Sequence, residues 1–268
     1  MTSHGGGGDP RTAVVLVAHG SRDPRGAVTT RALARAVGAA RPDWDVCESY
    51  LDHSLPRPVQ VLGALEAAGH TRAVLVPLLL TAAYHGRVDV PAEVAAARAA
   101  GLRMDVASAD VLGPVGGLVD PLLLDGLSRR LDEAVADEVD AGPGGEPLDA
   151  VVLAAAGTRN GAARGTVGRA AAALGARLGV PCTVAYASAA PPAAGAAVKR
   201  LRAAGATRVG LAAYFLAPGL LYDSAVASAR QAGVVAAAAP LGDASELVGL
   251  LASRVQAATV EPAPAYAA

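Results

Sequence analysis

The chain contains an internal duplication, and this limits the folds open to it. Residues 14–22 read VVLVAHGSR and residues 151–159 read VVLAAAGTR, so six of nine positions are identical without a gap. A second pair, AAGHTRAVLVPLLL at 67–80 and AAGATRVGLAAYFL at 203–216, aligns at an offset of 136 instead of 137 positions. The repeats of solenoid proteins are roughly 20–50 residues long. A repeat of this length therefore predicts two copies of one domain.

The stretch DAGPGGEP at 140–147 is rich in Gly and Pro and predicts the connection between the two copies. The expected organisation is a disordered tail at 1–12, a first domain at 13–140, a linker at 141–148, a second domain at 149–258 and a disordered tail at 259–268.

Short apolar runs alternate with longer amphipathic stretches in both copies. Strands are predicted near 13–18, 45–51, 73–80, 104–109, 150–155, 182–187, 207–213 and 234–239. Helices of the first copy are predicted near 27–40, 57–69, 90–101 and 116–137. Strands that are apolar throughout and separated by helices are typical of parallel sheets covered on both faces. The predicted fold class is α/β: two tandem duplicated doubly wound domains, each a central parallel sheet of about four strands flanked by helices.

Composition excludes several classes of protein. The net charge of −1 and the pI near 6.5, with no basic stripe, argue against a nucleic-acid partner. Cys47 and Cys182 lie in separate apolar segments, which argues against a disulfide framework or a thiolate cluster. The apolar runs are shorter than the ~20 residues of a membrane span, and the N-terminus lacks a secretory signal pattern. We expect a soluble cytoplasmic protein without a membrane partner.

Polar clusters follow three of the predicted strands. They read HGSRDPRG at 19–26, YLDHS at 50–54 and YHGRVDVP at 84–91. Parallel α/β sheets bind ligands outside the carboxyl ends of their strands. The three clusters are therefore expected to form one site.

Two imidazoles, His19 and His85, open the first and third clusters. Imidazoles bind divalent metals and accept protons near neutral pH. Asp52 is read either as an oxygen ligand or imidazole partner, or as a plain strand-end cap. If Asp52 faces the site, His53 points away. The remaining histidines, His4 and His70, are expected to be solvent-exposed.

The other candidates suit an anionic, planar ligand. Arg22 and Arg87 match the bidentate recognition of carboxylates, whereas Arg25 is expected to serve surface solubility. Tyr84 either stacks on a planar ligand or packs against the third helix. Ser21 lacks the GxSxG elbow of a hydrolase, and neither GxGxxG nor a phosphate loop is present. The residues together predict a metal with a polycarboxylate ligand.

The motifs VAHGSRDPRG and VPLLLTAAYHGRVDVP resemble those of the sirohydrochlorin chelatase family, within the class II tetrapyrrole chelatases, and the resemblance covers roughly residues 13–258. It implies insertion of a divalent metal into sirohydrochlorin, a tetrapyrrole with carboxylate arms, and no organic cofactor. The metal is a substrate, with Fe2+ for sirohaem favoured. The alternatives are Co2+ for cobalamin and a non-catalytic tetrapyrrole or metal carrier.

The resemblance also implies roles for residues. His19 and His85 match paired histidines that take pyrrole protons and hand over the metal, and Asp52 stands where many members carry a Glu that completes the ligands. The residues implied to contact the tetrapyrrole are Ser21, Arg22, Tyr84 and Arg87. Ala156 and Leu221 are the second-copy counterparts of the two histidines, and neither can bind a metal or accept a proton. The second copy is therefore expected only to enclose the site. Since single-domain members pair as dimers, the chain is expected to be a monomer with an internal pseudo-dimer.

Overall fold

The computed structural model describes residues 11–81, 90–140 and 146–260. In the first half the elements are β1 (Thr12–Ala18), α1 (Pro24–Ala40), β2 (Trp44–Tyr50), α2 (Pro58–Ala67), β3 (Arg72–Pro77), α3 (Val90–Ala99), β4 (Asp105–Ser108) and α4 (Pro121–Asp140). In the second half they are β5 (Ala150–Ala155), α5 (Gly161–Leu178), β6 (Cys182–Tyr186), α6 (Ala194–Ala203), β7 (Val209–Tyr214), α7 (Leu220–Gln231), β8 (Ala236–Ala237) and α8 (Ser245–Val260).

The strands form two parallel sheets with the same topology. The first has the order β2-β1-β3-β4 and the second the order β6-β5-β7-β8. In both sheets the first strand of the half lies between the second and the third, so the ends of three consecutive strands are neighbours. The predicted fold class, two duplicated doubly wound α/β domains, is confirmed.

Both faces of each sheet are buried, which explains the uninterrupted apolar strands. Side chains alternate along a strand, so Val14 and Leu16 of β1 face α1 and α8, whereas Val15 faces α2 and α3. In the second half Val151 and Leu153 belong to the same continuous core as Val14 and Leu16. The other face of that sheet packs against α6 and α7. One hydrophobic core therefore runs through both halves.

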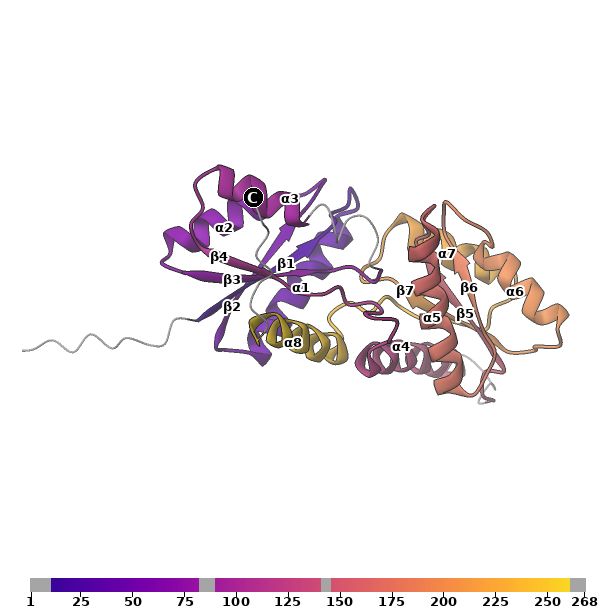
Figure 1. Cartoon of the computed structure of the whole chain (residues 1–268). Helices are drawn as coiled ribbons and strands as arrows, with labels where there is room; N and C mark the ends of the chain where they lie inside the picture. The colour runs from indigo at the N-terminus through magenta and orange to yellow at the C-terminus, as the bar shows by residue number, and fades with distance from the viewer. Residues whose placement is uncertain (1–10, 82–89, 141–145, 261–268) are drawn as a thin grey trace, which may run out of the picture.

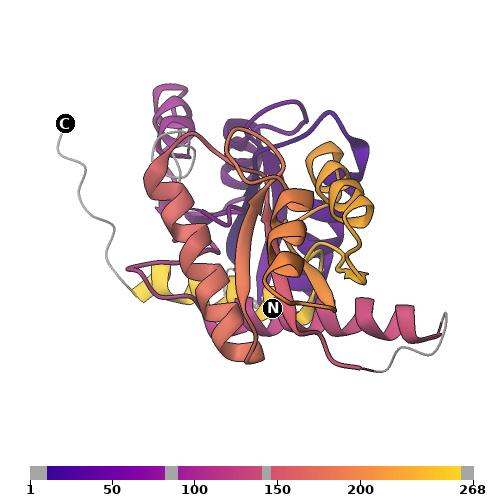
Figure 2. The ribbon, with the colours of Figure 1, turned by 90° about the vertical axis from the view of Figure 1, so that its right-hand side faces the viewer.

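Each half covers the other half's sheet with its last helix. Helix α4 packs against β7, β8 and α5, while α8 packs against β3, β4 and α1. Figure 1 shows α8 with the first-half lobe and α4 with the second-half lobe. The two helices run along the lower edge of the molecule in the turned view of Figure 2. They also contact each other, and Arg129 of α4 forms a bidentate ion pair with Glu246 of α8 at 2.7 and 2.9 Å.

Several boundaries differ from those expected. Helix α1 begins at Pro24, because the Asp23 side chain caps it and proline suits the first helical position. Strand β8 has only two residues. Thr12 and the helix end at Val260 lie in regular elements, although both were expected within tails. Residues 141–145 of the expected linker lie outside the described residues. Among the described helices, none is long and apolar enough to cross a membrane.

Candidate functional site

The turn after β1 places His19 at the tip of the strand. The backbone N–H of Asp52 donates to the carbonyl oxygen of His19 at 2.8 Å, which ties this turn to the end of β2. Gly20 has a φ of 92°. A Cβ at this position would lie 1.8 Å from the Asp52 carbonyl oxygen. Only glycine fits this close approach, and the exposed His19 side chain stands at the carboxyl edge of the sheet.

The next residues lead directly into α1. The N–H of Asp23 donates to Ser21 Oγ at 3.0 Å, and the Asp23 carboxylate accepts from the N–H of Arg25 at 3.0 Å. The contact with Arg25 holds the pKa of Asp23 below its ordinary value. The turn is therefore built by its own polar side chains, which fixes the positions of Ser21 and Arg22.

A cavity of about 540 Å³ opens between the two halves at this edge. Its volume lies within the range of small-molecule sites, roughly 300–1,000 Å³. The first half lines it with Ala18, His19, Gly20, Ser21, Arg22, Asp23, Gly26, Thr29, Thr30, Leu33, Tyr50, His53 and Leu78. The second half lines it with Ala156 and residues 215–222. The structure thus places His19, Ser21 and Arg22 at the same cavity.

Of the neighbouring residues Asp52 and His53, only His53 lines the cavity. His53 lines the cavity, whereas Asp52 is not among the lining residues and its side chain is 58% exposed. His53 has a positive φ of 58°, and its N–H donates to Asp52 Oδ1 at 2.8 Å. That hydrogen bond is the largest cause that lowers the pKa of Asp52, and the nearby side chains of His53, Arg57 and His19 lower it further. An ionised carboxylate therefore lies beside the imidazoles.

The remaining predicted residues, Tyr84, His85 and Arg87, lie outside the described residues. Within the described part of the chain, no three His, Cys, Asp or Glu side chains are grouped so that they could hold a metal ion. Cys47 and Cys182 are free, and burial raises the pKa of Cys182 to about 12. Neither cysteine has the character of a thiolate ligand.

The second half repeats the backbone conformation of the site but has no imidazole at the equivalent positions. Gly157 has a φ of 94°, and the N–H of Ser188 donates to the Ala156 carbonyl at 3.0 Å, as in the first half. Ala189 has a φ of 62° at the position equivalent to His53. The duplicated fold therefore sets these backbone conformations, and imidazoles at the two described positions occur only in the first half.

Arg25 joins the two halves at the rim of the cavity. Its Nη2 lies 2.6 Å from Asp23 Oδ2 and 2.6 Å from Asp223 Oδ2, in the first turn of α7. These two carboxylates raise the pKa of Arg25. The expectation that Arg25 only keeps the surface soluble was incomplete, because its second partner lies 198 positions away in the sequence.

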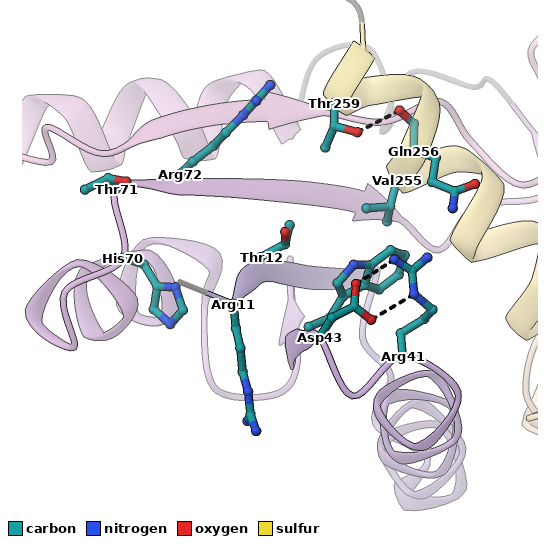
Figure 3. A pocket seen from close by; sticks show the side chains of 11 residues that line it. Arg11, Thr12, Arg41, Asp43, His70, Thr71, Arg72, Val255, Gln256 and Thr259 are labelled. Carbon is teal, nitrogen blue, oxygen red and sulfur yellow. Dashed lines mark hydrogen bonds and ion pairs between the residues drawn. The ribbon is translucent and has the colours of Figure 1, made fainter. Parts of the chain in front are cut away.

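A second cavity of about 360 Å³ lies at the opposite, amino edge of the first sheet (Figure 3). Arg41 and Asp43 form an ion pair at 2.7 Å within this cavity, and the Arg41 guanidinium stacks on Trp44. His70 also lines this cavity, and its Nε2 lies 3.1 Å from Asp45. The expectation that His70 is solvent-exposed was wrong, since its side chain is only 13% exposed. The charged side chains at this cavity thus have partners within the protein.

Comparisons with known proteins agree with this fold. SirB from Bacillus subtilis, solved with Fe3+, matches with a TM-score of 0.75 and 19% identity over 92% of this chain and 94% of that chain. The sirohydrochlorin chelatase SirB from Bacillus subtilis subspecies spizizenii, in complex with cobalt, matches with a TM-score of 0.71 and 17% identity over 94% and 97%. At such identities these matches show a shared fold.

Sequence relatives connect the chain to the same group. A sirohydrochlorin cobaltochelatase from Methanococcoides burtonii is 24% identical over 81 residues, which are 30% of this chain and 62% of that protein. The match thus spans less than two thirds of that relative. The model of the CbiX family matches residues 13–134 and 150–258, which make up most of the sequence and include both halves. The chain belongs to the CbiX family.

Proposed function

We propose that this protein is a sirohydrochlorin chelatase, which inserts Fe2+ or Co2+ into sirohydrochlorin on the route to sirohaem or cobalamin. Membership of the CbiX family supports this reaction class. The observation that carries the proposal is the cavity between the halves, where the exposed His19 stands at a strand end opposite an apolar segment. The reaction needs no organic cofactor, because the metal ion is itself a substrate.

His19 is the proton acceptor of the proposal. The inner N–H groups of a metal-free tetrapyrrole must lose their protons before a metal can occupy the ring. A neutral imidazole accepts protons near pH 7, and general-base help of this kind contributes roughly 10²–10⁴-fold. His85 is proposed as the second base, and Asp52 as an oxygen ligand that joins His19 and His85 in delivering the metal.

The carboxylate arms of the substrate need cationic and hydroxyl donors. Arg22 and Ser21 line the cavity and supply both. Tyr84 and Arg87 are proposed to complete this set. Binding energy from the arms is then available to bend or orient the ring, which a flat macrocycle requires before a metal enters.

One chain supplies both sides of the proposed site. Because the cavity is lined by the first and second halves of the same chain, we propose that the protein acts as a monomer, as an internal pseudo-dimer, in the cytoplasm. Imidazole nitrogen and carboxylate oxygen suit both Fe2+ and Co2+. The sequence-based preference for Fe2+ is therefore tested by metal competition with purified sirohydrochlorin.

The His19→Ala variant tests the proposal. We expect metal insertion to slow by roughly 10²–10⁴-fold, while sirohydrochlorin still binds, because the arm-binding residues remain. Insertion is followed by the change in tetrapyrrole absorbance on metallation, and binding by quenching of tetrapyrrole fluorescence. His70→Ala is the matched control, since His70 lies in the second cavity at the opposite edge of the sheet.

Two results would count against the proposal. If the double variant His19→Ala/His85→Ala inserted metal at the wild-type rate, the histidines would have no catalytic role. If the wild-type protein bound sirohydrochlorin but never metallated it, the non-catalytic carrier would be the correct function.

A further inference from the structure

The two sides of the cavity differ in polarity. The acidic, basic and imidazole side chains of its described lining all come from the first half: His19, Arg22, Asp23 and His53. The second half contributes Ala156 and the continuous segment FLAPGLLY at 215–222. We name residues 215–222 the apolar wall.

Contacts inside the second half fix the apolar wall in place. The Tyr222 hydroxyl donates to the Ala238 carbonyl at 3.0 Å, so its polar group is satisfied by the protein. The Tyr222 and Phe215 rings meet edge to face at 5.8 Å. The N–H of Leu241 donates to the Phe215 carbonyl at 2.9 Å. The wall is thus anchored to the second sheet and its following loop, and its residues line the cavity.

Two leucines of the apolar wall are exposed to an unusual extent. Leu220 is 78% exposed and Leu221 is 43% exposed at the start of α7. Apolar side chains that line a cavity gain free energy when an apolar ligand surface covers them. The wall carries no cation for a carboxylate arm, so the part of the ligand that suits it is the flat, conjugated ring.

We propose that the apolar wall binds one face of the tetrapyrrole ring, so that the metal ion enters only from the opposite face, where His19 lies. This inference rests on the proposed chelatase function. The repeat supports it, because Leu221 stands at the position equivalent to His85. An aliphatic side chain at that position removes a proton acceptor from the wall, and deprotonation is then confined to the other face of the ring.

The variant Leu220→Asp tests the ring-binding role. We expect the dissociation constant of metal-free sirohydrochlorin to rise about ten-fold or more, because ring binding would desolvate the new carboxylate without a partner. The KM for sirohydrochlorin should rise in parallel, and kcat at saturation should stay near the wild-type value. His19→Ala gives the opposite pattern, a lower kcat with ring binding preserved.

Leu118→Asp is the matched control. Leu118 is also 78% exposed but does not line the cavity, so sirohydrochlorin binding should stay within about two-fold of wild type. Leu220→Met keeps the wall apolar and should bind like wild type. Urea unfolding of each variant reports whether the fold is intact.

The outcomes separate the two proposals. If the wild-type protein metallates sirohydrochlorin and Leu220→Asp binds the ring as tightly as Leu118→Asp does, the wall does not bind the ring and the chelatase proposal stands. If the wild-type protein fails to bind sirohydrochlorin, both proposals are wrong.

Discussion

Gly20→Ala tests whether the close backbone contact at the site is needed for stability and for chemistry. The residue has a φ of 92°, and the new Cβ would lie 1.8 Å from the Asp52 carbonyl oxygen. Left-handed backbone costs an L-residue about 1–2 kcal/mol. Relief of the clash requires the β1 and β2 turns to separate, which breaks the 2.8 Å bond between Asp52 N and His19 O and costs about 1–2 kcal/mol more. We expect the free energy of unfolding to fall by about 2–4 kcal/mol.

Two glycines of the same chain separate the causes. Gly69 has a φ of 95° with no atom within 4 Å of an added Cβ, so Gly69→Ala measures backbone strain alone. Gly157 has a φ of 94°, and its Cβ would lie 2.0 Å from the Ser188 carbonyl oxygen. Gly157→Ala therefore reproduces the strain and the clash in the half that lacks the imidazoles.

Urea unfolding, followed by circular dichroism and by the fluorescence of the single tryptophan, Trp44, gives the three free energies. We expect Gly20→Ala and Gly157→Ala to lose similar stability, and Gly69→Ala to lose about 1 kcal/mol. Metal insertion per folded molecule should fall only for Gly20→Ala, because that substitution displaces His19. If Gly20→Ala were no less stable than Gly69→Ala, the argument from close approach would be refuted.

Two further predictions concern contacts between elements of the two halves. The bidentate Arg129 contact lowers the pKa of Glu246 from 4.5 to about 2. This contribution to stability is therefore complete above pH 4.5 and is lost as the pH falls towards 2. Between pH 5 and pH 2 in urea unfolding, Glu246→Gln should lose less stability than wild type, and equal losses would contradict the assignment. Tyr214→Phe removes the hydroxyl that donates to the Leu80 carbonyl at 2.8 Å in a buried position. It should lower the free energy of unfolding by about 1–3 kcal/mol, more than Tyr222→Phe at its half-buried contact. A smaller loss for Tyr214→Phe than for Tyr222→Phe would contradict this ranking.

Much of the fold could be predicted from the sequence. The repeat predicted two copies, and the uninterrupted apolar strands predicted parallel sheets buried on both faces. The order β2-β1-β3 places the ends of β1 and β2 side by side, and the polar clusters at 19–26 and 50–54 follow these two strands. These predictions succeed because strand direction and burial follow from local patterns.

Other features depend on contacts that a local pattern does not contain. An amphipathic stretch such as α4 shows that one face is buried but not which sheet covers it. The two readings of Asp52, a ligand or a strand-end cap, could not be separated from a local pattern, because the chain after β2 turns through the positive φ of His53. The partner of Arg25 on α7 and the lining residues Thr29 and Thr30 also follow from how the halves pack. Thr29 and Thr30 are neighbouring hydroxyl residues near the start of the helix that follows the HGSR motif. This pattern could have indicated that they line the cavity.

The exchange of α4 and α8 has a consequence for synthesis on the ribosome. Helix α8, which begins at Ser245, covers one face of a sheet whose last strand, β4, already ends at Ser108. The nascent N-terminal portion consequently carries a bare apolar surface for most of translation. A chaperone that shields such surfaces would be needed most by this segment, and truncated products ending before residue 245 should aggregate.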